Sequence, residues 1–197
     1  PFAVLGEAMH TPDEIAADIK WIRDRIGGKA FGIDLVLPAS VPESKTVDEL
    51  LAMIPQGHRD FEQHIKQKYN VPDPKVAPNL HQWGGLDQKR ALAQLEVIFD
   101  ERVPVFASGL GSPAFLLKRA HELNMQVWGL VGKPRQAKKQ ITAGTNVIIA
   151  QGYDAAGHTG NIGTFSIVPQ VVDQARGTGV PVLAAGGVTT GRHLAAA

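Results

Sequence analysis

Six short runs of apolar residues recur along this chain, and each is almost continuously apolar rather than alternating between apolar and polar positions. Such runs are expected for strands whose two faces are both covered, as in a parallel sheet. We therefore predict six buried parallel strands, at residues 2–5, 31–37, 103–107, 126–131, 146–150 and 181–185.

Segments of helical length lie between these runs and begin with recognisable N-terminal signals. Thr11 suits the N-cap of a helix, Pro12 suits the first helical position, and Glu14 can complete a capping box. Strands that alternate with helices of this length indicate βα units with right-handed crossovers. Further helix starts are predicted at Ser112-Pro113 and at Pro134, and the first helix is predicted to bury Ile15, Ile19 and Ile22.

The stretch 41–88 interrupts this rhythm because it is long and rich in Pro, His, Gln and charged residues. We interpret it as an irregular insertion within one domain that covers 1–197. Helices are predicted at 47–54 and 58–69, and a loop at 71–82. Insertions after barrel strands usually form lids and specificity loops.

Composition narrows the class of partner. With 44% hydrophobic and 20% charged residues and a net charge of +1, the chain can build one core, and it has no long Lys/Arg run for a nucleic acid. No apolar run approaches the roughly 20 residues that span a bilayer. The absence of cysteine excludes disulfides, thiolate metal sites and a thiol nucleophile. The expected partner is a small molecule, although six βα units fit either an open doubly wound sheet or an incomplete barrel.

The run from Gly109 to Ala114 reads G-x-G-x-x-A and follows a predicted strand. This is the context of a dinucleotide fingerprint, which also needs an acidic residue at the end of the next strand. That strand ends in Leu130-Val131-Gly132-Lys133 and offers no acid. We therefore favour a glycine turn between strand and helix over a dinucleotide site.

The run from Ala184 to Arg192 follows the last predicted strand and contains Gly186, Gly187 and Gly191. Glycines allow a ligand to approach the backbone closely, and the free N–H groups at a helix start attract anions. Barrels commonly place phosphate sites in the loops after their last strands. This turn is a candidate phosphate site, although plain turns of this composition are also common.

The run from Gln151 to Gly160 directly follows the strand at 146–150 and is the most informative motif. Gln151 is expected at the carboxyl end of that strand, where active sites of α/β proteins lie. Gly157 and Gly160 would let the loop pass close to a flat ligand and place His158 over it. A histidine there could act as a base or, when protonated, as a partner for an anion, although an isolated loop histidine is often only a solvated surface residue.

Other candidate sites are weaker. His58, His64 and His81 lie in the insertion without the spacing of a metal site, so we predict no metal ligands. Ser108 lacks the G-x-S-x-G context of a nucleophile elbow, which argues against acyl transfer.

Four segments together resemble the nitronate monooxygenase (2-nitropropane dioxygenase-like) flavoenzymes. The runs at 150–160 and 181–188, with 168–173 between them, resemble the family signatures A-Q-G-x-E-A-G-G-H-x-G and P-V-x-A-A-G-G-I in order and spacing. The run at 31–38 resembles the family's F-G-V-N-L strand. The resemblance implies a parallel (β/α)8 TIM barrel that binds FMN, here truncated to about strands 2–7.

The resemblance also implies roles for particular residues. Gln151, Gly152 and the backbone at Ala156 and Gly157 would contact the flavin, Gly186 and Gly187 its phosphate, and His158 would stand beside its reactive edge as the catalytic residue. Two departures stand out. Asp34 occupies the place of an Asn that contacts the flavin, and Ala156 and Asp154 replace a glycine and a glutamate. A methyl group at Ala156 is tolerable only with negative φ.

By this resemblance we expect an FMN-dependent nitronate monooxygenase that oxidises alkyl nitronates with O2 to a carbonyl compound and nitrite. The alternatives are an FMN-dependent enoyl-acyl-carrier-protein reductase and a non-catalytic flavin-binding barrel. We expect the protein to be cytoplasmic and to bind neither nucleic acid nor membrane. A homodimer is possible.

Overall fold

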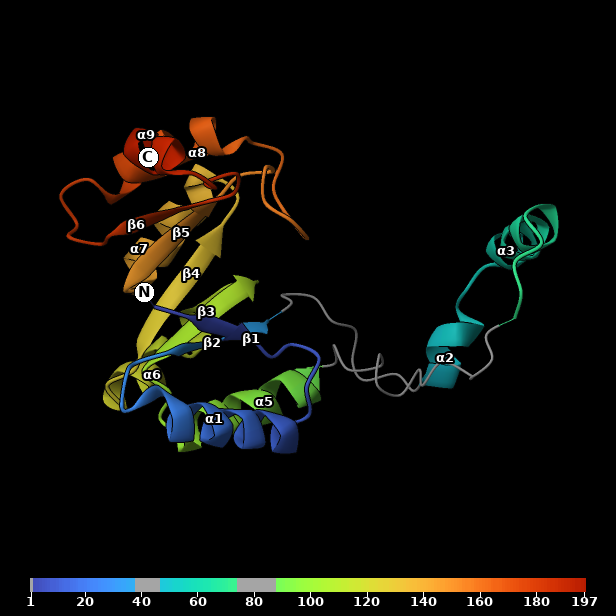
Figure 1. Ribbon diagram of the computed structural model, residues 1–197, viewed down its shortest axis with the longest axis horizontal. Helices are drawn as coiled ribbons and strands as arrows, with labels where there is room; N and C mark the ends of the chain where they lie inside the picture. Colours follow the sequence, from blue (N-terminus) through green and yellow to red (C-terminus); the bar gives the residue numbers. More distant parts are fainter. Residues whose placement is uncertain (1, 38–46, 74–87) are drawn as a thin grey trace.

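The computed structural model describes residues 2–37, 47–73 and 88–197. It contains one six-stranded parallel sheet in the sequential order β1-β2-β3-β4-β5-β6, which Figure 1 shows curling from β1 to β6. The expected fold class, an α/β half-barrel that fits a truncated TIM barrel, is confirmed. The strands are β1 Val4–Gly6, β2 Gly32–Val36, β3 Val105–Leu110, β4 Gln126–Val131, β5 Val147–Gln151 and β6 Val182–Ala185.

Apart from α2 and α3, the helices lie on the outer face of the curled sheet and follow the strands in turn (Figure 1). Their order along the chain reproduces the predicted βα rhythm, apart from the insertion. The helices are α1 Pro12–Ile26, α2 Val47–Ala52, α3 Gln56–Lys68, α5 Gln88–Asp100, η1 Pro113–Phe115 (a 3-10 turn), α6 Leu117–Glu122, α7 Pro134–Ala143, α8 Thr164–Ala175 and α9 Gly191–Ala196.

Helix α1 begins as its sequence predicts. The Thr11 side chain accepts the Glu14 N–H at 3.3 Å, and the Glu14 carboxylate accepts the Thr11 N–H at 2.7 Å, which completes the capping box. Gly27 ends the helix in the left-handed conformation with φ +60°. Ile15 and Ile19 are fully buried against the sheet, whereas Ile22 is partly buried.

Two apolar clusters hold the helices to the sheet. The first joins α1, α5 and α6 to β2, β3 and β4 through Ile15, Ile33, Leu35, Leu95 and Phe106, all almost fully buried. The second joins α7 and α8 to β4 and β5. Burial of each such side chain contributes roughly 1.5–3 kcal/mol, so the two clusters fix the strands whose carboxyl ends carry the predicted motifs.

The insertion contains α2 and α3, which Figure 1 shows standing apart from the sheet. Both predicted helices are present, with shifted ends. Most of the loop predicted at 71–82, including His81, lies outside the described residues. Among the described ranges, no helix has the length and apolar character needed to cross a membrane.

Candidate flavin and substrate site

A cavity of about 660 Å³ lies at the carboxyl ends of β3, β4 and β5. This is the edge of a parallel sheet at which ligands bind. Three segments that directly follow those strands line it, together with one face of α7. The lining residues are Gly109, Leu110, Gly111, Ser112, Leu130, Gly132, Lys133, Gln136, Lys139, Gln140, Gln151, His158, Thr159, Gly160 and Asn161.

Glycines shape the rim of this cavity where the chain makes close approaches. Gly111 has φ +87°, and a Cβ there would overlap the carbonyl oxygen of Leu37, so only glycine fits. Gly132 and Gly160 touch across the cavity wall, since a Cβ on Gly160 would lie 2.7 Å from the Gly132 carbonyl oxygen. Close packing therefore explains the glycines of the G-x-G turn at 109–111, without a bound dinucleotide.

The loop after β5 is anchored at its start and carries His158 further along. Gly152 is buried where a Cβ would overlap the Thr164 backbone nitrogen. The Asp154 carboxylate accepts the Thr164 N–H at 2.6 Å, and this hydrogen bond lowers the pKa of Asp154. Asp154 thus ties the loop to the start of α8, while His158 remains exposed and lines the cavity.

The glycine turn after β6 lies against the same loop. Gly186 and Gly187 have φ +105° and +71°. A Cβ on Gly186 would lie 2.7 Å from Thr164 Oγ1 and 2.9 Å from the Ala155 nitrogen, and one on Gly187 would lie 3.3 Å from Asp154 Cβ. The Thr164 hydroxyl also donates to the Ala185 carbonyl at 3.3 Å, which joins the two loops through one side chain.

Asp34 lies on β2, beside the glycine turn after β3. A Cβ on Gly109 would lie only 3.0 Å from Asp34 Oδ1, so the carboxyl group fills the space that glycine leaves. Burial raises the pKa of Asp34 to about 6, although a hydrogen bond from the Gly109 backbone acts in the opposite direction. Asp34 Oδ1 is buried with no hydrogen-bond partner in the described part of the chain, as expected for an atom that a ligand satisfies.

The structure places the predicted site residues in three adjoining groups. Gln151 and His158 line the cavity, and Asp34 lies next to Gly109, which is one of the lining residues. Gly152, Gly186 and Gly187 pack around Thr164 and the start of the loop after β5, rather than in the cavity lining. Ala156 and Gly157 are exposed in that loop. Positive φ outside glycine occurs in the described residues only at Asn70, Arg102 and Asn124, so the methyl group of Ala156 causes no backbone strain.

Several residues of the site were not singled out from the sequence. Lys133 is the second residue after β4, and Gln136 and Lys139 follow on α7. The position of Lys133 at a strand's carboxyl end was a usable signal, whereas Gln136 and Lys139 are recognisable only once α7 is placed. Thr164, which connects two loops, had no sequence signal of its own.

The donor set fits FMN, as the resemblance implies. Asp34 Oδ1 lacks a hydrogen-bond partner among the described residues, and the cavity lining carries Lys133, Lys139 and His158 but no carboxylate. An anionic cofactor or substrate would meet no like charge in that lining.

Comparison with known proteins agrees with these observations. The family model described as nitronate monooxygenase matches residues 2–197. A Mycobacterium tuberculosis protein named as a monooxygenase is 37% identical over an alignment of 203 positions, which covers 100% of this chain and 54% of that protein. A Staphylococcus aureus (strain MSSA476) protein named as a nitronate monooxygenase is 25% identical, with 98% of this chain and 52% of that protein covered.

A solved structure of nitroalkane oxidase from Streptomyces ansochromogenes superposes with a TM-score of 0.72 at 26% identity. The match covers 98% of this chain and 54% of that one. The chain therefore spans about half the length of the relatives it matches.

Proposed function

Because this chain belongs to the nitronate monooxygenase family, we propose that it forms the flavin-binding part of an FMN-dependent oxidoreductase that acts on alkyl nitronates. The products are a carbonyl compound and nitrite, and O2 is the electron acceptor. When bound, FMN would supply the redox chemistry that no amino-acid side chain provides. The protein's own residues would bind the flavin and hold the anionic substrate against it.

The observation that carries this proposal is the charge of the cavity. Its lining includes Lys133, Lys139 and His158 and, among the described residues, no Asp or Glu. A nitronate carries its negative charge on the nitro oxygens, which nearby cationic side chains attract. The apolar share of the lining, including Leu110 and Leu130, suits an alkyl chain.

The flavin contacts are proposed on the residues that adjoin this cavity. Gln151, Gly152 and the backbone at Ala156 and Gly157 would contact the ring system. Gly186 and Gly187 would take the phosphate on the backbone N–H groups of their turn. With a pKa of about 6, Asp34 is mostly ionised at pH 7, so it would accept hydrogen bonds rather than donate them.

His158 would be the catalytic residue because it lines the cavity on an anchored loop between Gly157 and Gly160. As a neutral imidazole it could remove the proton from the acidic carbon of a nitroalkane. As an imidazolium it could neutralise the nitro oxygens of a nitronate. Both roles need the same placement beside the substrate.

The test is the visible spectrum of the purified full-length protein, recorded before and after addition of propyl-2-nitronate under air while oxygen uptake is followed. A flavin spectrum with oxygen consumption and nitrite release supports the proposal. A flavin spectrum without turnover, bleached anaerobically by NADH or NADPH, would instead assign the reductase activity. A colourless protein that does not bind added FMN would reject both and leave a non-catalytic barrel.

A further inference from the structure

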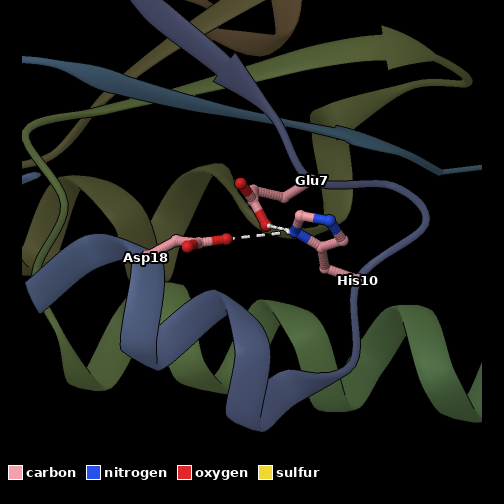
Figure 2. Close-up of side chains that lie close together, drawn as sticks. All are labelled: Glu7, His10 and Asp18. Atoms are coloured by element: carbon pink, nitrogen blue, oxygen red, sulfur yellow. Dashed lines mark hydrogen bonds and ion pairs between the residues drawn. The ribbon is translucent and has the colours of Figure 1, made fainter. Parts of the chain in front are cut away.

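Three side chains that could ligate a metal meet beneath the loop after β1, as Figure 2 shows. Glu7 directly follows β1, His10 lies in the loop, and Asp18 lies on α1. His10 Nδ1 is 2.6 Å from Glu7 Oε2 and 3.1 Å from Asp18 Oδ2, and the three potential ligand atoms all lie within 4.8 Å of one another. These residues do not line the cavity described above.

Glu7 is the unusual member of the cluster. Its side chain is fully buried, whereas those of His10 and Asp18 are 48% and 41% exposed. One of its oxygens, Oε1, is buried without a hydrogen-bond partner among the described residues. A buried carboxylate is costly unless both oxygens are satisfied, so the arrangement leaves one strong acceptor unused beside two further ligands.

The surrounding structure holds the loop in place without occupying that acceptor. The buried Gln94 side chain on α5 donates to the carbonyl oxygen of His10 at 2.6 Å and of Ala8 at 3.3 Å. The Glu7 backbone N–H donates to the Asp34 carbonyl oxygen at 2.9 Å. The backbone of the loop is therefore fixed, as a metal site of moderate affinity requires.

We propose that Glu7, His10 and Asp18 bind a divalent cation, and that Zn²⁺ fits best. One imidazole and two carboxylates form a mixed nitrogen and oxygen donor set that Zn²⁺ accepts and Mg²⁺ disfavours. With bonds of about 2.1 Å, tetrahedral ligands lie about 3.4 Å apart. His10 Nδ1 would therefore move away from Glu7 Oε2 and Asp18 Oδ2, which now lie 2.6 and 3.1 Å from it, and the two carboxylates, at most 4.8 Å apart, would adjust to the same spacing. Glu7 Oε1 or a water completes the coordination, and the ion neutralises both carboxylates.

The ion would tie the loop after β1 to helix α1. Since Glu7 also hydrogen-bonds the backbone of Asp34, a bound ion would brace the strand ends beside the cavity. This inference is independent of the proposed function, because its residues and its readout differ from those of flavin binding and turnover.

The experiment is a calorimetric titration of Zn²⁺ into the full-length protein, freed of metal by a chelator and carrying no histidine tag. The expected result is one equivalent of Zn²⁺ bound, with much weaker binding of Mg²⁺ and a Tm that rises with Zn²⁺ concentration. Failure of the wild-type protein to bind Zn²⁺ stoichiometrically would overturn the proposal.

Two matched variants locate the ion. Asp18→Asn and Asp13→Asn each remove one negative charge from α1, but only Asp18 belongs to the cluster. Asp18→Asn should weaken Zn²⁺ binding by at least about 10-fold, since loss of even an outer-shell partner costs about 10- to 100-fold, whereas Asp13→Asn should leave it unchanged. Equal affinities in the two variants would overturn the assignment. Glu7→Gln, checked for folding by circular dichroism, should weaken binding as much as Asp18→Asn.

Discussion

His158 is exposed, lines the cavity and lies between two glycines, so its removal should leave the protein's core unchanged. We expect His158→Ala to bind FMN normally and to lower kcat with a nitronate by about 10²-fold or more, the usual contribution of an acid-base or electrostatic catalyst. Steady-state oxygen uptake measures this. His121→Ala, which removes an exposed histidine outside the cavity, is the control. Unchanged turnover in His158→Ala would remove it from the mechanism.

Asp34 is the second residue whose chemistry the fold alters, because burial raises its pKa from 3.8 to about 6. Between about pH 4 and pH 6 the folded protein binds more protons at this site than the unfolded chain does. The free energy of unfolding contributed by Asp34 therefore falls as pH rises through this window. At neutral pH the ionised group is a net cost to the flavin-free protein.

Asp34→Asn removes this titration, so we expect the flavin-free full-length variant to be about 1–3 kcal/mol more stable than wild type at pH 7.5. The gain should disappear near pH 4. Urea denaturation across this pH range measures the difference. Asp24→Asn, at an exposed position on α1, should show no such gain. A stability difference between Asp34→Asn and wild type that does not grow between pH 4 and 6 would contradict this account of Asp34.

At the scale of elements, the glycine turn after β3 is the most constrained local structure around the cavity. Gly111→Ala should destabilise the protein by roughly 3 kcal/mol or more, since positive φ costs about 1–2 kcal/mol and the overlap with Leu37 adds to it. Gly28→Ala is the matched control, because Gly28 has φ +77° but no atom near its Cβ position. It should lose only the cost of positive φ. Equal losses in chemical denaturation would show that the overlap is relieved.

Local sequence patterns predicted the helices and strands well. Where a predicted helix or strand differs from the structure, long-range contacts explain the difference. Strand β4 and the capping box of α1 are as predicted. The helix predicted after Ser112 instead divides into η1 and α6. Leu116 and Leu117 are both buried there, and adjacent positions point in different directions on one straight helix, so the backbone changes form between them.

Site residues that lie in one loop could be predicted from the sequence. Site residues that come together only in the folded protein could not. Gln151 and His158 follow one strand, and their glycine-rich context could be recognised from sequence. Asp34 and Gly109 meet only because β2 and β3 are neighbours. The Glu7–His10–Asp18 cluster was missed because α1 must fold back over the loop before Asp18 reaches His10.

At the scale of the whole molecule, β1 and β6 each pair with a single neighbour in the described sheet. Val4, Leu5 and Leu183 on these strands are 39%, 38% and 42% exposed. Unpaired strand edges with apolar side chains recruit other chains. In the described sheet, the four inner strands are therefore paired on both sides, whereas β1 and β6 each have one unpaired edge.

A protein made only of residues 1–197 is therefore expected to self-associate with rising concentration. Light scattering coupled to size-exclusion chromatography measures this. Val4→Lys together with Leu183→Lys should shift the population toward monomer, because charged side chains protect exposed edges. Leu92→Lys, on the outer side of α5 and 44% exposed, should have little effect. A monomer at all concentrations would show that the edges are covered in another way.

The sequential strand order also sets the order in which the sheet can form. The chain between β3 and β4, or between β4 and β5, is 15 residues long, whereas 68 residues separate β2 from β3. Closing the longer connection costs about 1 kcal/mol more in chain entropy. The strands β3 to β5, which carry most of the cavity, can therefore assemble first as a local nucleus, and we expect the β1–β2 pair to join them later.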